Sequence, residues 1–157
     1  MDKKQIITEK ITKILHELGF TPEISVEETD GVFQVLLKTD TEASLLIGHF
    51  GETLSSLQRV MEAILFKSFN ELVPILINVN DYREKQKERI ENLAKNIAER
   101  TLSQQKISTL SAFSSYERKL IHEYISANYP NLQSYSEGMG RDRKIFIKIK
   151  SEDNEIV

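Results

Sequence analysis

The sequence predicts an α+β protein made of two small domains, and three observations lead to this prediction. The 157 residues are 39% apolar and 29% charged, the composition of an ordinary globular protein. Apolar residues recur at helical spacing in some segments and alternate with polar residues in others, first in the order αββααβ and then in the order αβαββ. Asn80-Asp81 separates the two runs, so the predicted domains are 1–80 and 81–157.

The first half is predicted to form a helix, two strands, two helices and a strand. Apolar residues at helical spacing end at Gly19, and glycine commonly terminates a helix. Asp30-Gly31 indicates a hairpin turn, because this pair readily adopts positive φ. In order, the predicted elements are a helix over 7–18, strands around 24–26 and over 32–37, a short helix from 41 or 42 to 47, a long helix over 54–70 and a strand over 74–79.

The second half is predicted to form a helix, a strand, a helix and two strands. Ser114 and Glu117 have the spacing of a capping box, which places a helix start at this point. The alternating charges of 83–91 predict a solvated helix face with ion pairs. In order, the predicted elements are a helix that starts after Asn80-Asp81 and closes at 104–105, a strand over 107–110, a helix over 115–128, strands over 132–135 and 144–149 joined by the turn 136–140, and a frayed tail over 151–157.

Composition argues against several classes of protein. The chain has no cysteine, so it can form neither a disulfide nor a cysteine-ligated zinc site. Its apolar runs are too short to span a bilayer and no secretory signal is recognisable, so we expect a cytoplasmic protein without a membrane partner. The three histidines lack the spacing of metal ligands, and neither a phosphate loop nor a nucleophile elbow occurs. We therefore expect no catalytic residue, metal or cofactor.

Charge is distributed unevenly between the two predicted domains. Residues 1–80 hold 7 Lys and Arg against 12 Asp and Glu, a net charge of -5, whereas residues 81–157 hold 14 against 12, a net charge of +2. The stretch 141–150 alone carries five basic residues and one acidic residue. A polyanion is therefore expected to bind the second half.

The segment Gly48-His49-Phe50-Gly51 lies between two predicted helices. Two glycines let a backbone approach phosphates without a Cβ in the way, and the N-terminus of the following helix offers free N–H groups at the same place. The loop alone is also compatible with a tight helix–helix turn. Its place within the αββααβ order favours a K-homology (KH) domain, in which such a loop clamps about four nucleotides of a single strand.

Arg118 and His122 are four residues apart on a predicted helix, so their side chains share one face. An Arg guanidinium suits phosphate, and His can donate to phosphate or stack on a base. The pair alone is also compatible with solvent exposure or with an ion pair to a neighbouring glutamate. Arg141, Arg143 and Lys144 follow a glycine-rich turn and are expected to extend a cationic surface beside the helix.

Three tyrosines are further candidates for stacking on unpaired bases, namely Tyr116, Tyr129 and Tyr135. Aromatic rings near cations contribute about 1–3 kcal/mol per stacked base. Packing within the domain is the competing interpretation for each of them, because tyrosines at helix ends are commonly half-buried.

Three segments together resemble the bacterial Jag family, also called KhpB, EloR or SpoIIIJ-associated. The first is the helix–loop–helix 46–60, LIGHFGETLSSLQRV, and the second is Asn80-Asp-Tyr-Arg83. The third is Ser115–His122, followed by Ser-Glu-Gly-Met-Gly at 136–140 and by Arg-Lys-Ile at 143–145. The match covers nearly the whole chain, in the right order and spacing.

The resemblance implies a type II KH domain over 1–80 and an Arg-x-x-x-His domain over 81–157. It implies a non-enzymatic regulator linked to cell elongation and division that binds single-stranded RNA in preference to DNA, with a small single-KH protein or a second copy as partner. The family's N-terminal Jag module is expected to be absent, and the family's loop usually carries basic residues between its glycines. The candidate nucleic-acid contacts are Gly48, His49, Phe50, Gly51, Arg118, His122, Arg141, Arg143 and Lys144.

Two alternatives remain beside a nucleic-acid binder. In the first, the acidic first half serves mainly to dimerise or to dock a partner, and RNA binding is residual. In the second, which the sequence favours least, His122 is the acid/base of a ribonuclease.

Overall fold

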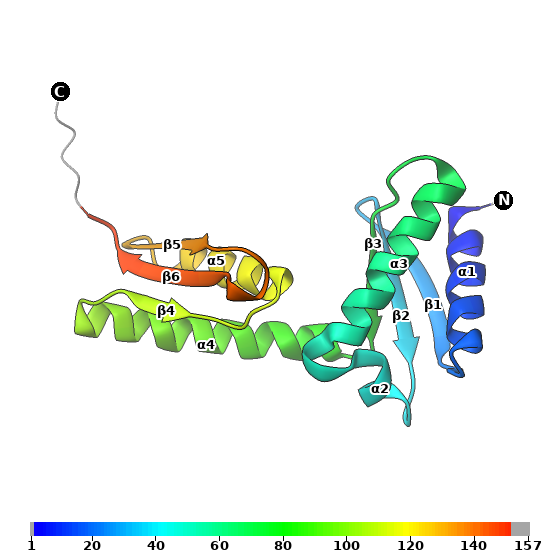
Figure 1. Cartoon of the computed structure of the whole chain (residues 1–157), viewed down its shortest axis with the longest axis horizontal. Helices are drawn as coiled ribbons and strands as arrows, with labels where there is room; N and C mark the ends of the chain where they lie inside the picture. Colours follow the sequence, from blue (N-terminus) through cyan, green and yellow to red (C-terminus); the bar gives the residue numbers. More distant parts are fainter. Residues whose placement is uncertain (1, 152–157) are drawn as a thin grey trace. The chain divides into compact units, whose positions relative to one another are not determined.

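The computed structural model describes residues 2–151 and divides into two compact units, Met1–Arg83 and Glu84–Val157. Each unit contains one three-stranded sheet with its own helices (Figure 1). The element orders are αββααβ and αβαββ, so the predicted α+β class with two small domains is confirmed. Of the predicted frayed tail, only Ser151 lies within the described residues.

In the first unit the sheet has the order β1-β2-β3, in which β1 is antiparallel and β3 parallel to β2. A parallel neighbour requires a crossover, which the two helices between β2 and β3 provide. The elements are α1 (Lys3–Glu17), β1 (Glu23–Thr29), β2 (Val32–Lys38), α2 (Ala43–Ile47), the 3₁₀ turn η1 (His49–Gly51), α3 (Glu52–Phe69) and β3 (Ile75–Val79).

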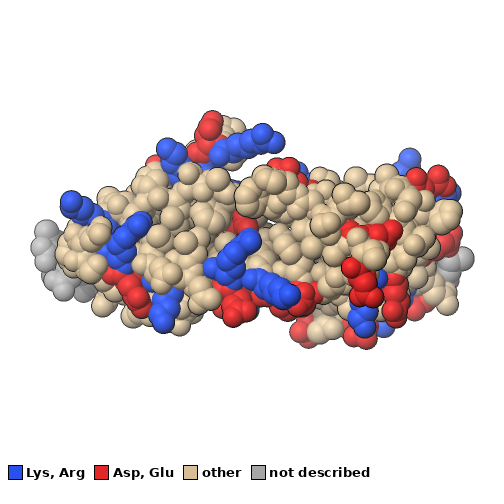
Figure 2. All heavy atoms as spheres, turned by 90° about the horizontal axis from the view of Figure 1, so that it is seen from below, with Lys and Arg blue, Asp and Glu red and all other residues tan. Residues whose placement is uncertain are grey.

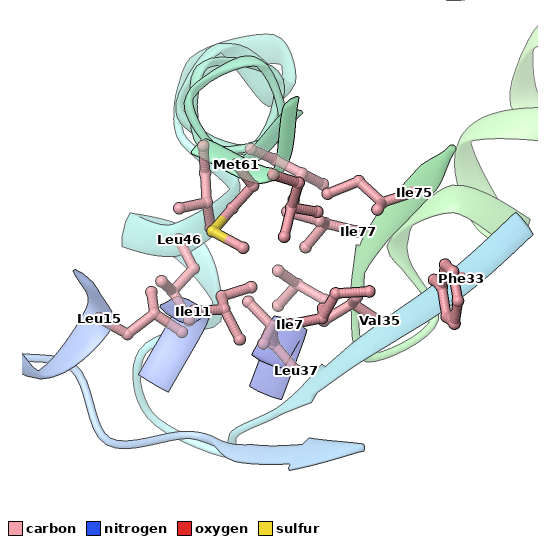
Figure 3. Packing of buried hydrophobic residues seen from close by; sticks show 14 of the residues in the cluster. Ile7, Ile11, Leu15, Phe33, Val35, Leu37, Leu46, Met61, Ile75 and Ile77 are labelled. Atoms are coloured by element: carbon pink, nitrogen blue, oxygen red, sulfur yellow. The ribbon is translucent and has the colours of Figure 1, made fainter. Parts of the chain in front are cut away.

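An apolar core joins the three helices of the first unit to its sheet. Ile7 and Ile11 of α1 point toward Val35 of β2 and Ile77 of β3, and Met61 of α3 lies in the same cluster (Figure 3). All five side chains are at most 1% exposed. This core fixes α2 and α3, and therefore the positions from which the glycine loop starts and ends.

The second unit has an antiparallel sheet of order β4-β6-β5, with β5 at one edge. Its core gathers α4, α5 and one face of the sheet, where Leu132, Ile145 and Ile147 are buried. The elements are α4 (Tyr82–Gln104), which begins within the first unit, β4 (Ser108–Leu110), α5 (Ser115–Asn128), β5 (Leu132–Glu137), the 3₁₀ turn η2 (Gly140–Asp142) and β6 (Lys144–Ile149).

The predicted start of α5 is confirmed in atomic detail. The Ser114 side chain accepts a hydrogen bond from the Glu117 backbone N–H at 3.2 Å, and the Glu117 carboxylate accepts one from the Ser114 N–H at 3.0 Å. These two bonds satisfy backbone donors that a helix start otherwise leaves unpaired. They fix the first turn of the helix that carries Arg118 and His122.

Two local predictions were wrong. Strand β5 continues past residue 135 to Glu137, because Ser136 and Glu137 pair with Ile145 and Lys144 of β6. Arg83 does not lie on a purely solvated helix face, since it is half-buried and its Nε donates to the Ile77 carbonyl at 2.6 Å. The i,i+4 periodicity of charge in α4 could not reveal this bond, because the acceptor lies on another element.

Candidate nucleic-acid interface

The glycine loop of the first unit has a backbone that only glycine adopts easily. Gly48 has φ 73° and ψ −177°, and Gly51 has φ 77° and ψ 14°. A Cβ on Gly48 would lie 2.1 Å from the Thr53 Oγ1, and a Cβ on Gly51 would lie 2.9 Å from the Tyr82 hydroxyl oxygen. The two glycines are therefore required by the conformation of the turn itself, whatever binds there.

The tip of this loop presents side chains of apolar and weakly polar character. His49 and Phe50 are exposed, with ring centroids 4.2 Å apart in an edge-to-face arrangement. Phe50 is 72% exposed and has φ 51°, an uncommon value for an aromatic residue. Leu45 of the preceding helix is 66% exposed. Helix α3 begins directly after the loop, so its N-terminal N–H groups lie at this end of the unit.

A second site lies in the other unit, where three of the predicted residues meet. Arg118 and His122 of α5 and Arg143, just before β6, line one open pocket of about 440 Å³. The predicted proximity of the Arg-x-x-x-His face and the glycine-rich turn is confirmed for Arg143. The other residues that line the pocket are Ser115, Lys119, Glu123, Ser134, Tyr135 and Ser136.

His122 is held by hydroxyl groups on both ring nitrogens. Its Nδ1 lies 2.8 Å from the Ser134 Oγ and its Nε2 lies 2.7 Å from the Ser136 Oγ. Burial lowers the pKa of His122 below 6.5, and the positive charges of Arg118 and Arg143 lower it further. The ring is therefore neutral at pH 7, with one nitrogen donating to a serine and the other accepting from a serine.

Both arginines are positioned by bonds to the main chain. Arg118 donates from Nη1 to the Phe113 carbonyl at 2.7 Å and from Nη2 to the Ser115 Oγ at 3.0 Å. Arg143 donates from Nη1 to the Gly138 carbonyl at 2.8 Å and from Nη2 to the Ser136 carbonyl at 3.4 Å. A guanidinium has five N–H donors, so these bonds orient each arginine without using all of its donors. A carboxylate partner for Arg118, the competing sequence interpretation, does not occur among the described residues.

The other two predicted basic residues lie elsewhere. Arg141 is exposed in η2 and Lys144 begins β6, and neither lines the pocket. Side chains alternate across a strand, so Lys144 lies on the face of the sheet opposite the buried Ile145. On the face drawn in the space-filling view, Lys and Arg are prominent over the second unit, and Asp and Glu over the first (Figure 2).

Sequence reasoning missed the two serines that hold His122. Ser134 and Ser136 occupy inward positions of β5, in line with the buried Leu132. Polar residues at two consecutive inward positions of a strand are the signal that could have pointed to them. Among the tyrosines, Tyr116 and Tyr129 pack against the apolar core, whereas Tyr135 stacks on Phe146 with ring centroids 5.2 Å apart.

Two absences hold for the part of the chain that the structure describes. None of the helices formed by residues 2–151 combines the length and the apolar composition needed to cross a bilayer. Over the same residues, no three His, Asp or Glu side chains gather in a way that could hold a metal ion.

Comparison with known proteins identifies relatives of both the second unit and the whole chain. Residues 88–148 match the family model of the Arg-x-x-x-His domain. The chain is 31% identical over 157 residues to RNA-binding protein KhpB of Clostridium symbiosum, covering 96% of this chain and 70% of that relative. It is 33% identical over 114 residues to RNA-binding protein KhpB of Bacillus subtilis (strain 168), covering 71% of this chain and 54% of that relative.

A third relative extends the similarity at lower identity. RNA-binding protein KhpB of Lactiplantibacillus plantarum is 28% identical over 137 residues, which cover 87% of this chain and 42% of that protein. The chain thus spans just over two thirds of the Clostridium relative and about half of the other two. The resemblance predicted from the three sequence segments is confirmed, and the chain belongs to the KhpB family.

Proposed function

We propose that this protein binds single-stranded nucleic acid, RNA in preference to DNA, and that the pocket of the second unit holds a phosphate of the strand. The meeting of Arg118, His122 and Arg143 in one open pocket carries the proposal. The name of the relatives, RNA-binding protein KhpB, supports RNA as the ligand.

The chemistry of the pocket suits a phosphodiester. Two guanidinium groups offer oriented donors and positive charge, and a charge-assisted bond from arginine to phosphate is among the stronger hydrogen bonds in proteins. The main-chain bonds of Arg118 and Arg143 hold both side chains in place before a ligand arrives, which reduces the entropy lost on binding. We infer that the pocket provides most of the affinity.

In this proposal the chain consists of two domains, 1–80 and 81–157. The first is a type II KH domain that also contributes to binding of the nucleic acid. The shape of the Gly48–Gly51 loop and the start of α3 directly behind it support a backbone clamp on the strand. His49 and Phe50 add no permanent charge, so this clamp is the weaker of the two sites. Arg141 and Lys144 lie outside the pocket, where their positive charge attracts the strand.

The pocket is tested by measuring the affinity of the full chain for a labelled single-stranded RNA by fluorescence anisotropy. Arg118→Gln and Arg143→Gln should each weaken binding by about tenfold, since hydrogen bonds to charged groups contribute roughly 1.5–3 kcal/mol. Lys95→Gln is the matched control, because it removes one positive charge from an exposed position of α4 and should leave the affinity within about twofold. Equal affinities for all four proteins would overturn the pocket.

The glycine loop is tested separately with His49→Asp combined with Phe50→Asp. These positions are exposed, and Asp tolerates positive φ better than most other residues, so the fold is retained. Substitution of the glycines themselves would disturb the turn before it tested binding. Gln5→Asp with Leu72→Asp adds the same charge at exposed positions away from the loop. A loop that contacts the strand predicts weaker binding for the first pair alone.

A second candidate function is protein interaction through the first unit. Phe50 and Leu45 are exposed apolar side chains at the loop end of a unit whose sequence carries a net charge of -5. Such a surface fits a small KH protein or a second copy better than it fits a polyanion. Leu45→Ser with Phe50→Ser should abolish association in sedimentation velocity, whereas Leu18→Ser with Leu72→Ser should not. A wild-type chain that is monomeric and captures no small KH protein removes this candidate.

The cellular role follows from the family resemblance as a proposal. We infer a cytoplasmic bacterial regulator, linked to cell elongation and division, that acts by binding RNA and not by catalysing a reaction. Crosslinking RNA to the protein in cells, followed by sequencing, tests this role. Recovery of no RNA above that of an Arg118→Gln, Arg143→Gln chain would contradict it.

A further inference from the structure

We propose that the face of the second sheet turned away from the helices is a base-stacking surface, made by Tyr135 and Phe146 between Lys144 and Lys148. Its occupants are unpaired bases of the strand whose phosphate binds in the pocket, so the inference rests on the proposed function. None of these four residues belongs to the set that forms the apolar core of this unit.

Strand alternation places the four side chains together. Ile145 and Ile147 of β6 are buried against the helices, so Lys144, Phe146 and Lys148 lie on the other face. Tyr135 of β5 is the cross-strand partner of Phe146. The two rings are 15° from parallel, with centroids 5.2 Å apart, and both residues are half-buried.

Lysines stand before and after this aromatic pair on β6. The Lys148 Nζ lies 5.6 Å from the centroid of the Tyr135 ring, within the range of a cation–π contact. Lys144 lies two residues before Phe146 on β6, and its cross-strand partner is Glu137. Glu137 is the single acidic residue at the outward positions of the three strands. Aromatic rings flanked by positive charge are complementary to a nucleotide, which has a planar base and an anionic phosphate.

The edge position of β5 connects this surface to the pocket. Tyr135 contributes to the lining of the pocket and also forms the aromatic pair. Ser134 and Ser136, its neighbours on the strand, hold His122 on the helix side. A single-stranded nucleic acid whose phosphate binds Arg118 and Arg143 therefore needs to cross only β5 for its next bases to reach the two rings.

An aromatic cross-strand pair also stabilises a sheet without any ligand, so the test must separate the two roles. The chain has no tryptophan, so Phe146→Trp in the full chain gives a single reporter on this surface. Addition of a single-stranded oligonucleotide should quench the fluorescence of this variant. Tyr124→Trp is the control, because Tyr124 packs against the core and lies beside Tyr129, and its fluorescence should change little. Equal quenching of both variants, or of neither, overturns the inference.

A second measurement compares an oligonucleotide with its abasic counterpart, which keeps the sugar–phosphate backbone. Wild-type protein should bind the intact strand about tenfold more tightly than the abasic strand. Tyr135→Leu with Phe146→Leu retains apolar bulk and should bind both strands equally. If these substitutions unfold the chain, the fluorescence quenching of the Phe146→Trp variant tests the inference in their place. A preserved tenfold difference in the leucine variant overturns the inference while leaving the pocket intact, whereas a wild-type chain that binds neither strand overturns the proposed function as well.

Discussion

His122 lies between two serine hydroxyls that can form hydrogen bonds with either tautomer of the ring. A neutral imidazole can donate to one serine and accept from the other, and a protonated ring can donate to both, because a hydroxyl is both donor and acceptor. The ring therefore changes charge without losing its position. Such a residue can respond to a bound anion electrostatically while the pocket keeps its shape.

Binding is expected to strengthen as the pH falls. In the free protein, burial and the two arginines hold the pKa of His122 below 6.5, so the ring is neutral at pH 7. A phosphate beside it opposes the arginines and raises the pKa in the complex, so the complex takes up a proton. Titrations at several values between about pH 8 and pH 5.5 should therefore show a Kd that decreases as the pH is lowered.

The same titrations locate the responsible histidine. His122→Gln should remove the pH dependence, whereas His49→Gln, at the tip of the glycine loop, should retain it. The opposite result would indicate that the anion binds at the glycine loop and not in the pocket.

Gly48 and Gly19 can be compared to measure how much an added Cβ destabilises the fold. Both have positive φ, but a Cβ on Gly48 would lie 2.1 Å from the Thr53 Oγ1, whereas a Cβ on Gly19 would meet nothing within 4 Å. We expect Gly19→Ala to lower the free energy of unfolding by about 1 kcal/mol, the usual penalty for a left-handed conformation. Gly48→Ala should cost roughly 3 kcal/mol, because strain and the clash add. Chemical denaturation measures both, and equal losses would contradict the clash.

The sequence could predict part of the site at this scale. Arg118 and His122 share a face because helical geometry places residues i and i+4 together, so the spacing alone is sufficient. Arg143 could be expected nearby only from the glycine-rich turn before it. The serines that hold His122 could not be predicted, because their partner is fixed by how α5 packs on β5, which a local pattern does not contain.

Among the elements, α4 begins with a bond network that ties its first turn to the rest of the first unit. The Gln58 Oε1 accepts hydrogen bonds from the Arg83 Nη2 at 3.0 Å and from the Ile77 N–H at 3.2 Å. The Arg83 Nε donates to the Ile77 carbonyl at 2.6 Å. One arginine thus joins α4 to β3 and α3.

Loss of this arginine should destabilise the first unit. Arg83→Ala removes the side-chain donor to the Ile77 carbonyl and one of the two donors to the Gln58 Oε1, so we expect a loss of about 2 kcal/mol in the free energy of unfolding. Arg83→Lys should fall between wild type and alanine, since an ammonium cannot reproduce the planar fork. Arg59→Ala, on the exposed side of α3, should stay within about 0.5 kcal/mol. Denaturation curves of the full chain provide the measurement, and a similar loss at both arginines would refute the network's importance.

Element boundaries show where sequence patterns stop being informative. The capping box predicted the start of α5 correctly, because its two hydrogen bonds are local. The sequence predicts the end of β5 two residues too early, because glutamate is a weak strand former and the strand continues through pairing with β6. Long-range hydrogen bonds overrode local preference there.

At the scale of the whole molecule, the difference in charge between the two halves leads to a prediction about salt. If three or four phosphates are neutralised, log K should fall with log salt at a slope of roughly −2 to −3 for a single strand. Arg118→Gln with Arg143→Gln should make the slope shallower by about one unit or more. Lys95→Gln should leave it unchanged. A slope near zero for the wild-type chain would show that neutralised phosphates contribute little.

The two edges of the second sheet bear on how the protein behaves at high concentration. Edge strands carry unpaired N–H and C=O groups that can recruit another chain and start aggregation. Here one edge, β4, is only three residues long, and the other, β5, reads Leu-Gln-Ser-Tyr-Ser-Glu, with a single aliphatic side chain. Neither edge is a long hydrophobic template of the kind that seeds fibrils. The same short, polar edge that leaves room for a ligand beside β5 therefore also protects the chain against self-assembly into extended sheets.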